Sequence, residues 1–393
     1  MHTYVVLAGE ISMHDGTPKA VQPAIDFNAL RQVSDRVGLA IRIGPYSGPF
    51  SEKDAIIRMA IEVATRRVAE ARQHGIEPVE CQIDFDCAES KLNGYAHWLT
   101  AFTSALKPLP VAPTVLPSWM KRREFTSLVR TTGHFVLQVH SVAPPRTISD
   151  TVKLTDPQRA IDWVEKAASA GVPFRVALPT YTYLVAFDQT GKPCGISAEG
   201  PSSTWPRAAK IVRWEADPAD IASLVARWQK DRPALLQGVI WYRLPVATDT
   251  LNWRWKTLAS VIEGRSPASH LKIQAEGEQP YDIVLLNDGE RDEPLPTTVE
   301  ALWTGPNLLA ADGLQGYQLE VFTPTMPPSA HGICLRLSEY ATLSRLPPGA
   351  RRNIGWIRCE NPVEIQLSIP DSARSRAGQL DDSGSSANSS DRL

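Results

Sequence analysis

The chain has 393 residues, which is enough for a large hydrophobic core and for two domains. Its net charge of −2 does not favour a partner such as nucleic acid or an anionic membrane surface. The sequence contains no run of eighteen apolar residues, so it predicts no membrane span.

The cysteines are scattered along the chain and odd in number. Their spacing matches neither a disulfide framework nor a paired metal-binding motif. We therefore expect free or simply buried thiols, and no metal ion or other cofactor. The five residues are Cys81, Cys87, Cys194, Cys334 and Cys359.

The first strand-like run, Tyr4–Ala8, follows Met1 almost directly. No basic segment and no cleavage site precede it, so the chain as written carries no signal peptide and is expected in the cytoplasm. A true start farther upstream would instead allow export. The composition does not predict an oligomeric state.

Strand-like and helix-like patterns alternate over the first 264 residues. Apolar stripes at helical spacing predict the helices, and the pairs Asp156-Pro157 and Asp217-Pro218 each place an N-cap before a proline at the first helical position. Such a βαβα series favours a parallel sheet or barrel. The strand-like runs are Tyr4–Ala8, Gly38–Gly44, Val79–Asp86, Val111–Leu116, His134–His140, Pro173–Leu178 and Gly238–Leu244.

Seven such strands are one fewer than a (β/α)₈ barrel needs. We predict an α/β fold in which residues 1–264 form a TIM-barrel-like domain that lacks its first strand, with the gap beside Tyr4–Ala8. An open doubly wound sheet is the alternative. The nucleotide-binding versions of that sheet have no support, because no G-x-G-x-x-G or Walker-type loop is present.

Two further regions complete the predicted organisation. After the strand Pro173–Leu178, the segment 181–193 predicts a β-hairpin at the end of the barrel where active sites lie, and this insertion extends to about Arg207. Short strand-like runs separated by turn residues predict an antiparallel β-sandwich over residues 271–370, packed on the barrel. Residues 371–393 are rich in Ser, Asp, Gly and Arg and are expected to be a disordered tail.

The segment Glu80–Asp86 is the most informative of the predicted strands. Period-2 alternation sends Glu80, Gln82, Asp84 and Asp86 to one face and the apolar residues to the other. A strand flanked by two amphipathic helices should be buried, and buried strands are normally apolar throughout. A polar face that ends in two carboxylates therefore predicts either a site at the carboxyl end of the strand or a buried charge network.

Polar and aromatic residues also follow the other predicted strands. In a barrel these strand ends converge on one mouth, where aromatic walls and a few carboxylates are suited to a sugar. The candidate catalytic residues are Asp84, Asp86 and Glu10. The candidate substrate-binding residues are Arg42, Trp119, Gln138, His140, Tyr181, Trp241 and Arg243.

Each candidate also has a structural interpretation. Arg42 and Arg243 could neutralise the two aspartates in a buried ion network. His140 could be a hydrogen-bonded structural residue, and the two tryptophans could cap the barrel.

The order of several short motifs resembles a bacterial family, domain of unknown function 3142. The motifs are Gln82-Ile83-Asp84-Phe85-Asp86, Leu116–Trp119, Val136–His140, Leu178–Tyr181, Ile240–Pro245, Leu286–Glu290 and Gly355–Arg358. The resemblance implies a glycosidase-like barrel with a β-rich extension, and a further strand upstream of Tyr4 in a protein that is often exported. The activity of the family is not established.

A more distant similarity is to chitinase-type barrels, in which alternating acids on one strand end in a catalytic glutamate. If Asp84 and Asp86 take the last two aspartate places of that pattern, the glutamate position holds Ala88, and Glu89 is one residue away. The chitinase mechanism therefore does not carry over to this sequence.

We predict a carbohydrate-active barrel in which one aspartate is an acid of raised pKa and the other an ionised base or nucleophile, with Glu10 as a spare candidate. The alternative is a non-catalytic glycan-binding or cell-envelope scaffold protein. A third hypothesis, a metal-dependent hydrolase built on Asp84, Asp86 and His140, lacks a supporting motif such as H-E-x-x-H. The sequence does not identify the substrate or the linkage, and it does not decide between retention and inversion.

Overall fold

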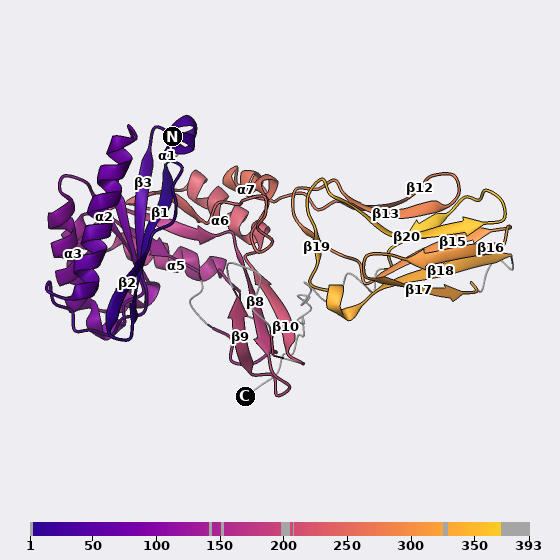
Figure 1. The fold of residues 1–393 in the computed structure, drawn as a ribbon, viewed down its shortest axis with the longest axis horizontal. Helices are drawn as coiled ribbons and strands as arrows, with labels where there is room; N and C mark the ends of the chain where they lie inside the picture. Colours follow the sequence, from indigo (N-terminus) through magenta and orange to yellow (C-terminus); the bar gives the residue numbers. More distant parts are fainter. Residues whose placement is uncertain are drawn as a thin grey trace, which may run out of the picture. The chain divides into compact units, whose positions relative to one another are not determined.

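The computed structural model describes residues 3–140, 144–150, 153–197, 205–206, 208–324 and 329–370. The predicted tail, residues 371–393, lies outside the described residues. Contacts divide the chain into two compact units (Figure 1). The first unit comprises Met1–Asn252 and Leu258–Ser266, and the second comprises Trp253–Thr257 and Pro267–Leu393.

The first unit contains a large sheet with strand order β11-β7-β6-β5-β4-β3-β1-β2. All neighbours from β11 to β1 are parallel, and β2 is antiparallel to β1. The seven parallel strands correspond in order to the seven predicted ones, whereas β2 was not predicted. The strands are β1 (Tyr4–His14), β2 (Thr17–Val21), β3 (Val37–Ile43), β4 (Cys81–Phe85), β5 (Val111–Val115), β6 (Phe135–Gln138), β7 (Phe174–Pro179) and β11 (Leu236–Tyr242).

This sheet has two edges among the described strands. One edge is β11. At the other, β2 pairs with β1 only from Glu10 to His14, so the amino-terminal half of β1 has no partner strand on that side in the described part of the chain. This open edge includes the predicted run Tyr4–Ala8.

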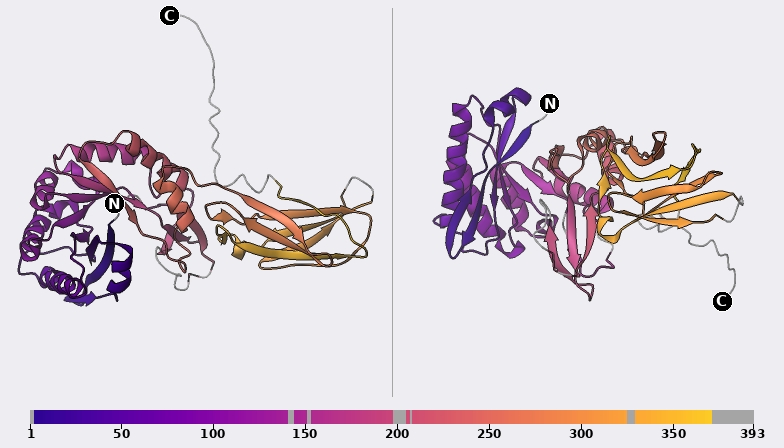
Figure 2. Two further views of the ribbon diagram at one scale, coloured as in Figure 1. Left: turned by 90° about the horizontal axis from the view of Figure 1, so that it is seen from above. Right: turned by 45° about the vertical axis from the view of Figure 1, so that its right-hand side comes forward.

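Helices connect the parallel strands and lie along the outer side of the curved sheet (Figure 2). Asp156 and Asp217 cap their helices as predicted, since their carboxylates accept hydrogen bonds from the backbone N–H groups of Arg159 and Ala219. No described helix is both long and apolar enough to cross a membrane. The helices are α1 (Phe27–Val33), α2 (Ala55–Gln73), α3 (Leu92–Leu106), α4 (Glu124–Thr132), α5 (Pro157–Ala168), α6 (Pro218–Lys230) and α7 (Trp255–Ile262), with short 3₁₀ turns η1 (Glu89–Lys91) and η2 (Pro117–Lys121).

A smaller antiparallel sheet, with strand order β10-β8-β9, is inserted after β7. Its first two strands form the predicted hairpin, and the third returns the chain to α6. The strands are β8 (Thr182–Phe187), β9 (Pro193–Ser197) and β10 (Lys210–Glu215).

The second unit is rich in antiparallel strands. Two four-stranded sheets, ordered β12-β13-β20-β16 and β17-β18-β15-β21, share a core that includes Ile283, Ile333 and Ile354. The strands are β12 (Leu271–Glu276), β13 (Tyr281–Asn287), β14 (Glu293–Pro294), β15 (Thr298–Thr304), β16 (Leu308–Gly313), β17 (Tyr317–Phe322), β18 (Ala330–Leu337), β19 (Arg345–Leu346), β20 (Arg351–Cys359) and β21 (Gln366–Ser368), and one 3₁₀ turn, η3 (Glu339–Ala341), precedes β19.

Candidate functional site

Polar side chains from successive strands meet at the carboxyl end of the large sheet, on the face opposite its helices. Glu10 of β1 is in register with Arg42 of β3, and Arg42 is in register with Asp84 of β4. Since paired residues of parallel strands point to the same side of a sheet, the three charged side chains form a row. We call Glu10, Arg42, Asp84, Asp86 and Gln138 the carboxylate cluster.

Asp84 is held by its neighbours on both sides. Its Oδ1 accepts hydrogen bonds from Thr114 Oγ1 at 2.9 Å and from Gln138 Nε2 at 3.0 Å. On the other side, its Oδ2 lies 3.8 Å from Arg42 Nε. The side chain is one-quarter exposed, so the carboxylate is oriented by the protein and still reaches solvent.

Asp86 follows β4 directly and has a different environment. No hydrogen bond or ion pair of its side chain is found among the described residues, and the residue is exposed by overall surface area. Even so, adjacent protein atoms desolvate the carboxyl and raise its pKa above the ordinary value, and the charge of Asp84 raises it further. Arg42 acts in the opposite direction. Two carboxylates two residues apart therefore lie in different environments.

Glu10 approaches the group through Arg42. Its Oε1 lies 3.6 Å from Arg42 Nη1, and both side chains are nearly half exposed. Arg42 therefore lies between Glu10 and Asp84 and is partly exposed, whereas the ion-network interpretation placed it in a buried network with Asp84 and Asp86.

A second set of predicted residues lies at the ends of β6, β7 and β11. His140 is 7 % exposed, and its Nδ1 is 3.0 Å from the Tyr181 hydroxyl. That hydroxyl is 3.4 Å from the hydroxyl of Tyr183, and the imidazole stacks on Tyr242 at a centroid distance of 6.0 Å. We call His140, Tyr181, Tyr183 and Tyr242 the histidine–tyrosine cluster.

Three of the predicted substrate-binding residues are placed differently from the expectation. Trp119 is fully buried and donates a hydrogen bond to the backbone oxygen of Cys87 at 3.0 Å, so it braces the loop after β4 and does not line a cleft. Arg243 Nη1 lies 2.5 Å from Asp249 Oδ2, and no contact of Arg243 with Asp84 or Asp86 is found among the described residues.

Trp241 is the third, and its misplacement has a local cause. It is in register with Leu178, whose side chain is fully buried on the helix side of the sheet. The register of β11 against β7 shifts between Leu236 and Gly238. Such a bulge reverses the alternation of every later side chain, so Tyr242 and not Trp241 points to the polar face.

The sequence interpretation missed Thr114, Tyr183 and Tyr242. Thr114 could have been found by alternation, because it lies two residues after Ala112, which is in register with Gln82 on the polar face of β4. Tyr242 could not, because the bulge reverses its phase. Tyr183 belongs to β8 of the inserted sheet, and no local sequence pattern predicts that this sheet brings it close to His140.

The same face carries a separate ion cluster at the amino end of the strands. Glu80 precedes β4, and its two carboxylate oxygens accept hydrogen bonds from Arg175 Nη1 at 2.8 Å and Nη2 at 2.6 Å. Gln82 Nε2 donates to it at 2.8 Å, and His134 Nε2 lies 3.8 Å away. Burial alone would raise the pKa of Glu80, but His134, Arg175 and Gln82 together lower it to about 2.

No site for a metal ion is present in the part of the chain that the structure describes, because no three His, Cys, Asp or Glu side chains are grouped closely enough. Asp84, Asp86 and His140 therefore do not form the ligand set that a metal-dependent hydrolase would need.

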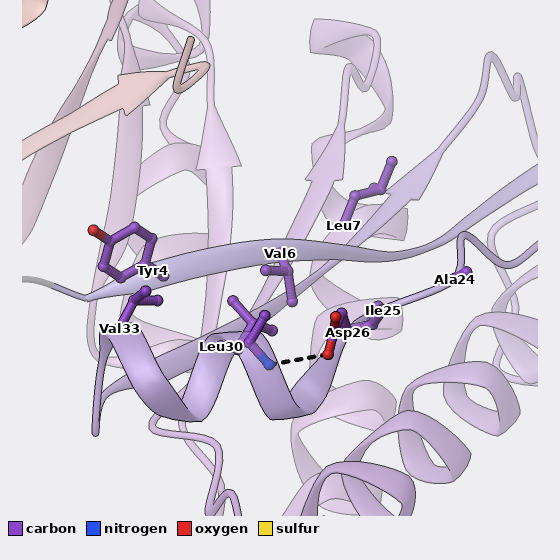
Figure 3. A pocket seen from close by; sticks show the side chains of 9 residues that line it. Tyr4, Val6, Leu7, Ala24, Ile25, Asp26, Leu30 and Val33 are labelled. Atoms are coloured by element: carbon purple, nitrogen blue, oxygen red, sulfur yellow. Dashed lines mark hydrogen bonds between the residues drawn. The ribbon is translucent and has the colours of Figure 1, made fainter. Parts of the chain in front are cut away.

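An apolar pocket of about 500 Å³ lies away from both polar clusters, between the amino-terminal half of β1 and helix α1 (Figure 3). Its one acidic lining residue, Asp26, caps α1 by accepting a hydrogen bond from Ala29 N at 2.9 Å. The pocket therefore supplies no free acid or base. Its lining consists of Tyr4, Val6, Leu7, Ala24, Ile25, Asp26, Ala29, Leu30 and Val33.

Comparison with solved structures finds similar chains at low sequence identity. A chitinase from Chromobacterium violaceum is 13 % identical with a TM-score of 0.44, covering 67 % of this chain and 90 % of that one. Chitinase ChiA74 from Bacillus thuringiensis is 10 % identical with a TM-score of 0.40, covering 87 % and 83 %. The spore cortex-lytic enzyme SleL from Bacillus cereus is 12 % identical with a TM-score of 0.43, covering 67 % of each.

Comparison with curated proteins finds no match. Two family models match different parts of the sequence. The model described as domain of unknown function DUF8456 matches residues 271–360. The model described as domain of unknown function DUF3142 matches residues 47–247, which include β4, β6 and β7 with their polar ends. The chain is therefore a member of the DUF3142 family.

Proposed function

We propose that this protein is a carbohydrate-active enzyme that cleaves a glycosidic bond at the carboxylate cluster. In this proposal the parallel strands are the larger part of a (β/α)₈ barrel within residues 1–264. Residues 271–370 are a separate β-sandwich domain. The observation that carries the proposal is the unequal environment of Asp84 and Asp86.

The two carboxylates suit different roles in acid–base catalysis. Asp86 has a raised pKa and no protein partner in the described chain, which is what a general acid needs in order to hold a proton for the leaving oxygen. Asp84 accepts two hydrogen bonds and lies near a guanidinium, and these contacts orient its carboxylate for the role of base or nucleophile. Environment thus separates the roles of two identical side chains.

Their spacing along β4 and the residue that follows it places the two carboxylates close enough for this division. Side chains two residues apart on a strand start from Cα atoms roughly 6.6 Å apart. Carboxyl groups about 5–5.5 Å apart favour retention and about 6.5–9.5 Å inversion. Side-chain rotation spans both ranges, so both stereochemical outcomes are compatible with the proposal.

A second candidate is a protein that binds glycans without cleaving them. Arg42 favours it, because this arginine lies within 4 Å of both Glu10 and Asp84 and could keep these two carboxylates as a permanently charged, purely structural row. In that case the mouth of the sheet would recognise a sugar but supply no proton.

Hydrolysis of a panel of oligosaccharides by the parent, Asp84→Asn and Asp86→Asn proteins tests the two candidates. The enzyme proposal expects turnover by the parent and its loss in both variants, with melting temperatures unchanged. Absence of turnover in the parent, together with a lower melting temperature of Asp84→Asn, would leave the ion row as a structural feature and overturn the proposal.

A further inference from the structure

The histidine–tyrosine cluster contains a buried nitrogen that the fold leaves unused. His140 Nε2 is inaccessible to solvent and has no hydrogen-bond partner among the described residues. An unpaired buried polar atom destabilises the folded state, so native structures rarely keep one. This nitrogen is therefore available for a hydrogen bond with a bound ligand.

His140 lies on the same face of the sheet as the carboxylate cluster. His140 lies two residues beyond Gln138, and the pairing of β6 with β7 continues there through Val139 N and Ala177 O at 3.5 Å. Alternation puts His140 on the same face as Gln138, whose amide donates to Asp84. Nδ1 faces Tyr181 at the end of β7, so Nε2, on the other edge of the ring, is directed away from that contact.

The charge state of the ring limits the class of ligand. Burial lowers the pKa of His140 to about 4, so the imidazole is neutral near pH 7 and offers no charge to an anion. A metal ion would need further ligands, and no group of three His, Cys, Asp or Glu side chains is found in the described chain. A neutral ligand remains.

The hydrogen-bonding character of the cluster fits a hydroxyl group. The Tyr181 hydroxyl can donate to Nδ1 or accept from it, so Nε2 can be either an N–H donor or a bare acceptor. A hydroxyl can match both forms. The rings of Tyr181 and Tyr242 lie beside the imidazole, and Tyr242, which is only partly buried, is of the aromatic type that packs on the apolar face of a sugar ring.

We propose that His140 Nε2 is the hydrogen-bonding atom of a subsite for a hydroxyl group of a neutral sugar, and that Tyr181 is the positioning residue that orients the imidazole. The inference rests on the proposed function only in taking the ligand to be a carbohydrate. It does not require that Asp84 and Asp86 cleave anything.

Nuclear magnetic resonance of the histidine rings in the ¹⁵N-labelled full chain tests the inference directly. The His140 signals are identified by their absence from the spectrum of His140→Phe. Cellotetraose, xylotetraose, maltotetraose and chitotetraose are then added one at a time. We expect at least one of them to shift the Nε2 resonance in the parent and in Asp86→Asn alike. If none of the four moves it, the inference is wrong.

Two histidine variants separate binding from stability. His140→Phe should weaken binding of the active oligosaccharide about tenfold or more. Its melting temperature should stay close to that of the parent, because removal of the unpaired Nε2 offsets the lost hydrogen bond between Nδ1 and Tyr181. The matched control is His134→Phe, near the other end of the same strand. It should bind as the parent does but melt lower, because His134 lies beside Glu80. Unchanged binding by His140→Phe would contradict the inference.

Tyr181→Phe tests the positioning role. Removal of the hydroxyl should change the tautomer reported by the His140 resonances before any sugar is added, while the fold is retained. The outcomes also separate this inference from the proposed function. Hydrolysis with an unchanged KM in His140→Phe overturns the subsite alone, whereas a shift of Nε2 without hydrolysis by the parent overturns the catalytic role alone.

Discussion

Glu80 and Asp86 lie at opposite ends of β4 and on the same polar face, yet their environments differ. Glu80 is 6 % exposed, accepts a bidentate pair of hydrogen bonds from Arg175, and has its pKa lowered to about 2. Asp86 is exposed, has no partner in the described chain, and has its pKa raised. A carboxylate whose oxygens are all engaged in hydrogen bonds and ion pairs stabilises the fold. A carboxylate without such contacts can take part in catalysis.

The two histidines near the ends of β6 also differ. His134 is partly exposed and lies beside Glu80, whereas His140 is buried among tyrosines, and burial lowers its pKa to about 4. The amino end of the sheet therefore resembles a closed ion cluster, and the carboxyl end keeps groups whose hydrogen-bonding capacity is unfilled.

The largest expected effect is on catalysis at the carboxyl end. Asp86→Asn should reduce kcat by about 10²–10⁴, because general acid assistance typically contributes that factor. Stability should not fall, since no partner of Asp86 is lost. Steady-state kinetics and thermal melts of the same samples measure both quantities. A large loss of stability with Asp86→Asn would remove the contrast with Glu80.

The amino end should respond in the opposite manner. Arg175→Met leaves Glu80 buried without its main partner and should lower the free energy of unfolding by about 3–5 kcal/mol, as measured by urea titration. The double variant Glu80→Gln/Arg175→Met should recover part of this loss because no unpaired charge remains. Equal loss in the single and double variants would mean that packing, and not charge, is responsible.

Acid should weaken the ion cluster around Glu80 and so lower the stability of the fold. The folded-state pKa near 2 lies below the unfolded value, so the contribution of Glu80 is fully present above about pH 4.5 and is lost as the pH falls towards 2. The loss should amount to about 3 kcal/mol. Unfolding curves between these pH values measure it. Glu80→Gln should lack this component of the pH dependence, and a curve identical to that of the parent would contradict the assignment.

The smallest expected effect concerns the orientation of Asp84. Thr114→Val removes one of its hydrogen bonds without changing the shape of the side chain. A net contribution of about 1 kcal/mol corresponds to a roughly fivefold fall in kcat with KM little changed. Ser in place of Thr114 keeps the hydroxyl and is the matched control. A fall in both Thr114 variants would point to packing.

Much of this comparison could be predicted from local sequence. Alternation in the segment Glu80–Asp86 predicted that its polar residues share one face, because the direction of a side chain on a regular strand depends only on its position. The hydrogen bond from Gln82 to Glu80 agrees with this prediction. The same reasoning failed for Trp241, where a bulge shifts the register of β11. The position of a bulge depends on the pairing with the neighbouring strand, so it cannot be predicted from the sequence of one strand.

The sequence by itself determined the alternating strands and helices and the polar face of β4, because periodicity and capping are local properties. Only the tertiary structure decided which charges meet. Arg175, which was not considered, neutralises Glu80, and Asp249 engages Arg243, which had been expected near the aspartates. Ion pairing depends on strand register and on where connecting segments return. These are set by packing over long sequence distances, so residues of identical chemistry can become structural at one end of a strand and available for reaction at the other.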